Sequence, residues 1–263
     1  MQPYEQNQYT YGSAFAPSQV QVDQGLRAFM LGVYNNMILG LAISGLVALG
    51  TNMLAIANSP ASAVARVGSN IYLTQLGALL YTSPLKWVIM LAPIAFIFLF
   101  SMRMDRMSAA SARGMFFAFA AVMGLSLSTI FLVFKLGSIV QVFFVTAAAF
   151  GALSLYGYTT KRSLSGMGSF LIMGAFGLML ASIVNIFLAS SALQFAISCI
   201  GVVIFAGLTA YDTQKLKEMY VYELGTPNGE VAAKASIFGA LTLYLDFINM
   251  FQFLLSLMGN RNE

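Results

Sequence analysis

Histidine is absent from this 263-residue chain, and charged residues are scarce. Without histidine the protein has no Ser–His–Asp catalytic triad and no zinc site with histidine ligands. Its single cysteine, Cys199, can form no internal disulfide. Charged residues make up 8% of the sequence, whereas soluble domains carry about 25%. The sequence is therefore not that of a soluble globular domain, and histidine-based catalysis is excluded.

Hydrophobic residues make up 59% of the chain, which predicts an all-α integral membrane protein. We expect a disordered polar tail over residues 1–22 and one transmembrane domain over residues 23–263. The tail lacks the basic start and apolar core of a signal peptide. The net charge of +4 comes from residues at the ends of apolar stretches, with no basic run interleaved with aromatics. We therefore expect a lipid bilayer around the chain and no nucleic-acid partner.

Seven apolar stretches predict seven transmembrane helices. The second stretch has only 16 residues between Lys86 and Arg103, whose long side chains can snorkel to the interface. Two segments are expected to lie along the membrane surface: a short helix that begins after Asp23, and the connection over residues 57–85. The seven stretches are Val33–Ile56, Trp87–Met102, Met115–Phe134, Ile139–Tyr158, Ser169–Ser190, Ala192–Tyr211 and Ser236–Met258.

Basic residues are distributed unequally between the two sides of these stretches. Cytoplasmic segments of membrane proteins carry an excess of Lys and Arg. The bias predicts a multi-pass protein of the cell (inner) membrane, with the N-terminus in the cytoplasm and the C-terminus outside. The nine residues on the predicted inner side are Arg27, Arg103, Arg106, Arg113, Lys161, Arg162, Lys215, Lys217 and Lys234, and the four on the outer side are Arg66, Lys86, Lys135 and Arg261.

One acidic residue, Asp246, lies near the middle of the seventh stretch. An ionised carboxylate at that depth is costly, and intramembrane acids usually mark ion or proton paths. Thr242 and Asn249 lie on the same side of the helix and would extend a polar path. These two are equally well explained as hydrogen-bonding groups between helices. Asp212 ends the sixth stretch close to Lys215 and is either an ordinary interfacial acid or a functional group.

Two motifs in the last third of the chain resemble those of a known family. The segments AYDTQKLKEMY (210–220) and GALTLYLDFINMFQFLLSL (239–257) closely resemble the Bax inhibitor-1 family, also called the transmembrane Bax inhibitor motif family, in its bacterial members. The resemblance extends from about residue 25 to the end of the chain. It implies seven transmembrane helices, six of them in two layers around a central seventh. It also implies a pH-sensitive calcium leak across the membrane.

The same resemblance implies roles for three residues. The family's two pH-sensing aspartates fall on Asp212 and Asp246, which share a proton when the path is closed. Arg103 falls on the arginine that latches the first aspartate in the closed form. The chain departs from the family in a longer connection between the last two stretches, over residues 215–235. Depth alone places Asp246 about 15 Å along its helix from the face where Asp212 lies, so the stretches by themselves do not pair the carboxylates.

Three functions remain open at this point. The first is a pH-sensitive calcium leak channel with no cofactor and no catalytic residues, in which Asp212, Asp246, Asn249, Thr242 and water transiently bind Ca²⁺. The second is a membrane-embedded regulator that binds other membrane proteins, such as a membrane protease or a stress-response partner, without transport. The third is an intramembrane aspartyl protease, because two carboxylates can share acid and base work. The Gly-x-Gly-Asp motif usual in that class is missing before Asp246.

Overall fold

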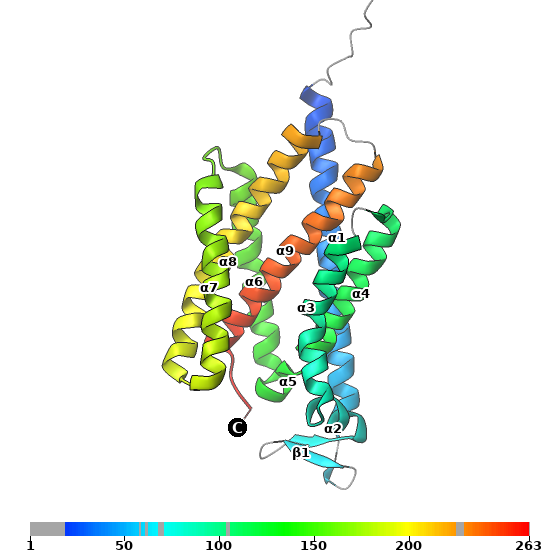
Figure 1. The fold of residues 1–263 in the computed structure, drawn as a ribbon, viewed down its shortest axis with the longest axis vertical. Helices are drawn as coiled ribbons and strands as arrows, with labels where there is room; N and C mark the ends of the chain where they lie inside the picture. The colour runs from blue at the N-terminus through cyan, green and yellow to red at the C-terminus, as the bar shows by residue number, and fades with distance from the viewer. Residues whose placement is uncertain are drawn as a thin grey trace, which may run out of the picture.

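The computed structural model describes residues 19–57, 59–60, 63–67, 71–103, 106–224 and 229–262. Within these residues the protein is an all-α membrane protein with six helices long and apolar enough to cross a bilayer (Figure 1). The six are α1 (Gln19–Ala55), α4 (Ala109–Leu127, continued by the short α5, Ile130–Val133), α6 (Leu136–Thr159), α7 (Ser165–Leu188), α8 (Ser191–Glu218) and α9 (Gly229–Met258). The tail predicted for residues 1–22 lies outside the described residues as far as residue 18.

A further candidate span consists of two helices that meet at a bend. Together α2 (Gln75–Tyr81) and α3 (Leu85–Arg103) are apolar and long enough to cross, but their axes differ by 61°. Pro84 lies at the break, where its missing N–H leaves no helical hydrogen bond unmade. The connection before α2 contains a small antiparallel hairpin of β1 (Ala65–Val67) and β2 (Ile71–Leu73). The predicted count of seven spans requires the bent pair to cross as one unit.

Two expectations about the connections are wrong. The chain from Asp23 into the first span is one continuous helix instead of a separate surface helix, because no proline interrupts α1. Residues 215–235 are mostly helical: α8 runs to Glu218, a π-helix (η3) covers Met219–Leu224, and α9 begins at Gly229. Apolar stretches mark what can lie in lipid and not where a helix ends, so both α8 and α9 extend beyond them.

The last helix, α9, is the centre of the bundle. It runs obliquely between α1, α3 and α4 on one side and α6, α7 and α8 on the other (Figure 1). In the most apolar 18-residue stretch of α9, 56% of the residues are buried inside the protein. In the corresponding stretches of the other five candidate spans, 17–33% of the residues are buried. It packs against α1, α4, α6 and α8, while α3 packs against α4 and α7 packs against α8. A polar group on the inner face of α9 is therefore shielded by protein rather than by lipid.

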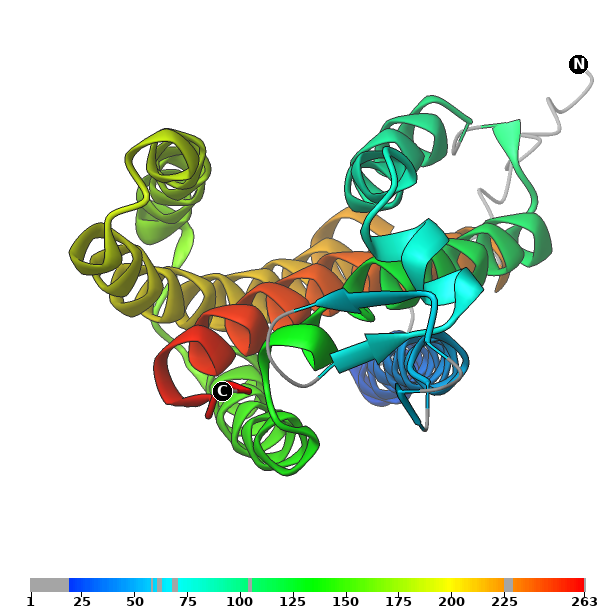
Figure 2. The same ribbon diagram turned by 90° about the horizontal axis from the view of Figure 1, so that it is seen from below.

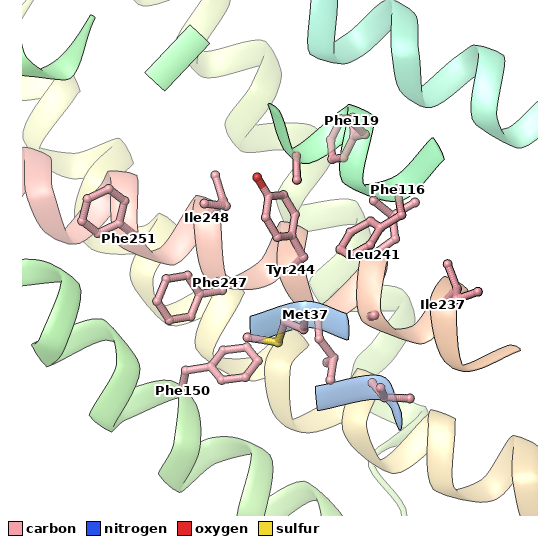
Figure 3. Packing of buried hydrophobic residues seen from close by; sticks show 14 of the residues in the cluster. Met37, Phe116, Phe119, Phe150, Ile237, Leu241, Tyr244, Phe247, Ile248 and Phe251 are labelled. Carbon is pink, nitrogen blue, oxygen red and sulfur yellow. The ribbon is translucent and has the colours of Figure 1, made fainter. Parts of the chain in front are cut away.

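Aromatic rings fill the space around the middle of α9. Tyr244 is fully buried, and its ring meets Phe116 and Phe119 of α4 at centroid distances of 5.7 and 5.8 Å (Figure 3). Its hydroxyl lies 2.6 Å from Ser44 Oγ, and Ser44 Oγ donates to the carbonyl of Ala120 at 2.6 Å. These contacts hold α9 to α1 and α4, and they fix the rotation of α9 about its own axis.

Candidate functional site

The antiparallel packing of α8 on α9 determines which residues of the two helices face each other. Gly201 of α8 lies against the ring of Phe253, and Gly239 of α9 lies against the side chain of Leu216. In an antiparallel pair with these contacts, Asp212 falls within about one helical turn of the level of Asp246. The sequence analysis placed the two aspartates far apart in depth because it ended the sixth helix at residue 211 and began the seventh at residue 236. The true helix ends lie beyond both positions.

Asp212 and Asp246 are near enough in this interface to influence each other electrostatically. Asp246 is 4% exposed, and Asp212 is half-buried. One oxygen of Asp246, Oδ2, is buried and has no hydrogen-bond partner among the described residues. A carboxylate only accepts hydrogen bonds, whereas a protonated carboxyl group also donates one. A single proton held between the two acids would therefore supply the missing hydrogen bond.

Thr242 and Asn249 do not bind the aspartates in this structure. Thr242 Oγ1 donates to the carbonyl of Phe238 at 3.2 Å, and Asn249 Nδ2 donates to the carbonyl of Leu245 at 2.8 Å. Both bonds run back along α9, and both side chains are half-buried. Such bonds satisfy polar groups inside a helix in lipid. Asn249 Oδ1 and the hydroxyl oxygen of Thr242 keep acceptor capacity, so their place on an ion path stays a prediction.

Arg103 is not brought to Asp212. It is the last residue of α3, it is exposed, and it forms no ion pair with Asp212 in the part of the chain that the structure describes. The central helix α9 separates α3 from α8 (Figure 1). The cation whose charge acts on Asp212 is Lys215, which also lies 6.0 Å from the ring centroid of Tyr211. The arginine latch stays a prediction, and it would require α3 to move toward α8.

A hydrogen-bonded chain of hydroxyl groups, which the sequence reading missed, ties three helices together beside the aspartates. Tyr34 OH of α1 lies 2.6 Å from Ser154 Oγ of α6, which in turn lies 3.0 Å from Thr213 Oγ1 of α8. Ser154 is 3% exposed and Thr213 is fully buried. Thr213 directly follows Asp212, so this hydroxyl chain holds the part of α8 that carries the acid. Lone hydroxyl residues in separate apolar stretches leave no spacing pattern by which they could be paired from the sequence.

Further contacts hold the same end of α8. Gln214 accepts a hydrogen bond from the backbone N–H of Leu164 at 2.6 Å and donates to the carbonyl of Arg162 at 2.8 Å. Lys217 donates to the carbonyl of Tyr158 at 2.9 Å. These bonds fasten the end of α8 to the α6–α7 connection. These bonds and the hydroxyl chain hold α8 to α1, to α6 and to the α6–α7 connection. A change in the charge of the aspartates therefore acts on the packing of α8 against α9.

The chemistry of this site is that of two carboxyl groups without a dedicated metal cage. No group of three or more Asp, Glu, Cys or His side chains that could hold a metal is found among the described residues. A carboxyl pair without further side-chain ligands suits proton exchange and transient cation contact, because Ca²⁺ takes six to eight oxygen ligands and accepts waters among them.

The fold is that of a multi-pass α-helical membrane protein, with Asp246 buried in its last spanning helix and Asp212 half-buried on the helix before it. Residues 26–263 match the family described as Inhibitor of apoptosis-promoting Bax1, and the chain belongs to this Bax inhibitor family. It is 46% identical over 244 residues to a protein of Caulobacter vibrioides described as uncharacterized, covering 93% of both chains. It is 43% identical over 242 residues to the inner membrane protein YbhL of Escherichia coli K12, covering 92% of this chain and 95% of YbhL. Family membership and location in a membrane, both predicted from the sequence, are confirmed.

Proposed function

We propose that this protein is a pH-sensitive calcium leak channel and not an enzyme, and that Asp212 and Asp246 form its gate. The observation that carries the proposal is the meeting of these two acids between α8 and α9, with a buried oxygen of Asp246 that lacks a donor. Intramembrane acids are costly and usually serve ion or proton movement. Family membership supports the same reading through the resemblance of the two motifs that contain these residues.

In the closed state the pair holds one proton. A protonated carboxyl of one aspartate donates to the other, so the buried oxygen gains a partner and only one negative charge remains. The charged and titratable groups at the pair are the two acids themselves and Lys215, whose charge acts on Asp212. Tyr244, the other titratable residue nearby on α9, bonds to Ser44 toward α1 and takes no part in the pair. One proton therefore keeps α8 and α9 docked.

Opening follows when the pH rises and the shared proton leaves. Two carboxylates about 4 Å apart at an effective dielectric constant of about 20 repel each other by about 4 kcal/mol. A change of 1.4 kcal/mol alters an equilibrium tenfold, so this repulsion suffices to shift a closed–open equilibrium by about three orders of magnitude. A divalent cation then replaces the lost proton, with carboxylate oxygens, water and the free acceptor atoms of Asn249 and Thr242 as its ligands.

We further propose seven spans, with α2 and α3 crossing as one bent unit and α9 at the centre of two layers. The end of the bundle at which α8 finishes and α9 begins, here named the basic end, would then face the cytoplasm. It carries the nine basic residues counted in the sequence analysis, because α3, α6 and α8 end there and α1, α4 and α9 begin there. This assignment puts the N-terminus inside, following the positive-inside bias.

Calcium flux into liposomes that contain only the purified protein tests the proposal. The expected result is a flux that rises as the pH is raised, without any partner protein present. Absence of flux at every pH in correctly folded protein would refute the leak and favour a regulator of other membrane proteins. Cleavage of a hydrophobic peptide that depends on both aspartates would instead identify an intramembrane protease.

A further inference from the structure

Two hollows lie end to end between α1 and α6. The larger measures about 960 Å³ and the smaller about 530 Å³. Both are bordered by Leu41 and Ala42 of α1, by Phe143 of α6 and by Phe247 of α9. Seen from below in Figure 2, α1 and α6 both lie on one face of α9, the lower one in the picture, although they lie to the right and left of α9 in Figure 1. The two hollows therefore form one groove, named here the α1–α6 groove, whose floor is α9.

The walls of the α1–α6 groove are apolar and suit a hydrocarbon chain. Leu31 and Ile38 of α1 and Leu155 of α6 border it and are 52%, 59% and 61% exposed. In the smaller hollow the polar side chain is Ser44, whose hydroxyl already bonds to Tyr244 and Ala120. An apolar surface of this kind inside a membrane-spanning region is in contact with lipid chains and not with water.

One end of the groove is charged. Asp23 and Arg27 both border the larger hollow, both are exposed, and neither forms an ion pair with another described residue. They lie one turn apart on the same side of α1, with a rise of about 6 Å between them. Lys217, behind this end, is held by the carbonyl and ring of Tyr158, which also borders the hollow. The groove thus presents a cation and an anion side by side, neither of them in an ion pair with another residue that the structure describes.

The length of the larger hollow fits one leaflet. From Arg27 to Leu41 the helix rises about 21 Å, which covers the headgroup region and the hydrocarbon of one leaflet in a core of about 30 Å. A phospholipid of that leaflet has its phosphate at the level of Arg27 and an acyl chain directed toward Phe247. A choline or ethanolamine headgroup also carries a cation next to the phosphate, and a primary ammonium can donate hydrogen bonds to a carboxylate, whereas choline cannot.

We propose that the α1–α6 groove binds one zwitterionic aminophospholipid, phosphatidylethanolamine, with its phosphate on Arg27, its ammonium on Asp23 and an acyl chain along α6 toward Phe247. Asp23 disfavours an anionic headgroup such as that of phosphatidylglycerol, because it would face a second negative charge without a cation in between. Occupancy of this site does not depend on the calcium leak. Basic positions at the ends of spaces between spanning helices are known sites for lipid headgroups.

Gly151 offers a direct way to fill the groove. It borders the larger hollow, and a Cβ built at this position meets no atom within 4 Å. Gly151→Leu therefore occupies the space of the acyl chain and also favours the helix, since leucine is a better helix former than glycine. Gly177 on α7 also meets no atom within 4 Å and does not border the groove. Gly177→Leu is the matched control for added bulk.

Native mass spectrometry of the full chain in detergent tests the site with phosphatidylethanolamine, phosphatidylcholine and phosphatidylglycerol of identical acyl chains. We expect one tightly retained phosphatidylethanolamine in the wild type and in Gly177→Leu, and its loss in Gly151→Leu. Arg27→Gln should weaken the binding of phosphatidylethanolamine about fivefold. This factor corresponds to about 1 kcal/mol, the contribution of one basic residue near a membrane surface. Asp23→Asn should abolish the preference for phosphatidylethanolamine over phosphatidylcholine.

Two results would overturn the proposal. If the three lipids are retained equally, and if Gly151→Leu does not change their retention, the lipids bind around the bundle and not in the groove. A preference for phosphatidylglycerol that Arg27→Gln removes would show an anionic-lipid site, contrary to the pairing with Asp23. Circular dichroism of each variant confirms that the helices are intact, so a loss of lipid reports on the groove.

Discussion

The hydroxyl chain from Tyr34 through Ser154 to Thr213 predicts a measurable energetic coupling between α1 and α6. Ser154 lies 2.6 Å from Tyr34 OH and 3.0 Å from Thr213 Oγ1, and it is buried. Ser154→Ala removes both bonds, while Thr213 keeps its bond to the carbonyl of Thr209 at 2.7 Å. Hydrogen bonds between spanning helices average about 0.6 kcal/mol and reach about 1.7. Because Ser154 makes two, we expect Ser154→Ala to cost about 1–2 kcal/mol.

A double-mutant cycle separates the bond from the loss of packing. Tyr34→Phe alone should cost about 0.5–1 kcal/mol, and the double variant should cost less than the sum of the two by about 0.6–1.7 kcal/mol. Reversible unfolding of the purified protein in mixed micelles, followed by circular dichroism, measures these free energies. Ser182→Ala, which removes only a bond to the carbonyl of Leu178 in its own helix, is the matched control. Additivity within about 0.3 kcal/mol would refute the inference that these hydroxyls act as one chain.

Three further predictions concern the gate and the topology. Arg103→Ala should raise the calcium leak at low pH and Arg103→Lys should fall between it and the wild type, because lysine lacks the forked guanidinium; an unchanged leak would leave Arg103 as a topological charge. In a background without Cys199, a cysteine placed before Gln24 should react only from the cytoplasm and one placed after Met258 only from outside, and labelling of both from one side would contradict an odd number of spans. Asp212→Asn should flatten the pH response of the flux, because one carboxylate alone has no like charge to repel, and it should raise the leak at low pH, because the proposed latch by Arg103 loses its partner; a wild-type flux–pH curve would argue against a shared proton.

The membrane class, most of the helices and the position of Asp246 on a protein-facing side of its helix were predictable from the sequence. Apolar runs of about 20 residues are set by bilayer thickness, so composition alone reveals them. A charge in the middle of such a run has few structural explanations, which is why Asp246 stood out. Its burial at 4% exposed surface agrees with a helix surrounded by protein on several sides. The two family motifs predict that Asp212 acts together with Asp246, and the packing of α8 on α9 brings the two residues to a similar level in the bundle.

The relative position of Asp212 and Asp246 was not predictable from the sequence. Apolar stretches indicate how deep a residue lies in the membrane, but they do not give the register of two helices that pack together. The register of α8 on α9 depends on close contacts at glycines, such as Gly201 against Phe253 and Gly239 against Leu216. The same windows ended α8 at residue 211, although it continues as a polar helix to Glu218. Arg103 shows the opposite limit: the family motif assigns it a partner that lies across α9 in this structure.

Calcium flux as a function of pH in liposomes containing wild-type protein, Asp246→Asn or Asp246→Glu tests the central claim most directly. Asparagine keeps the size and hydrogen-bonding capacity of the side chain but removes the anionic site at mid-membrane, whereas glutamate keeps the carboxylate. The gate described here predicts flux that rises with pH in the wild type, a retained pH response in Asp246→Glu, and low flux at every pH in Asp246→Asn. If Asp246→Asn conducts calcium with the wild-type dependence on pH, the buried acid is structural and the carboxyl pair is not the gate.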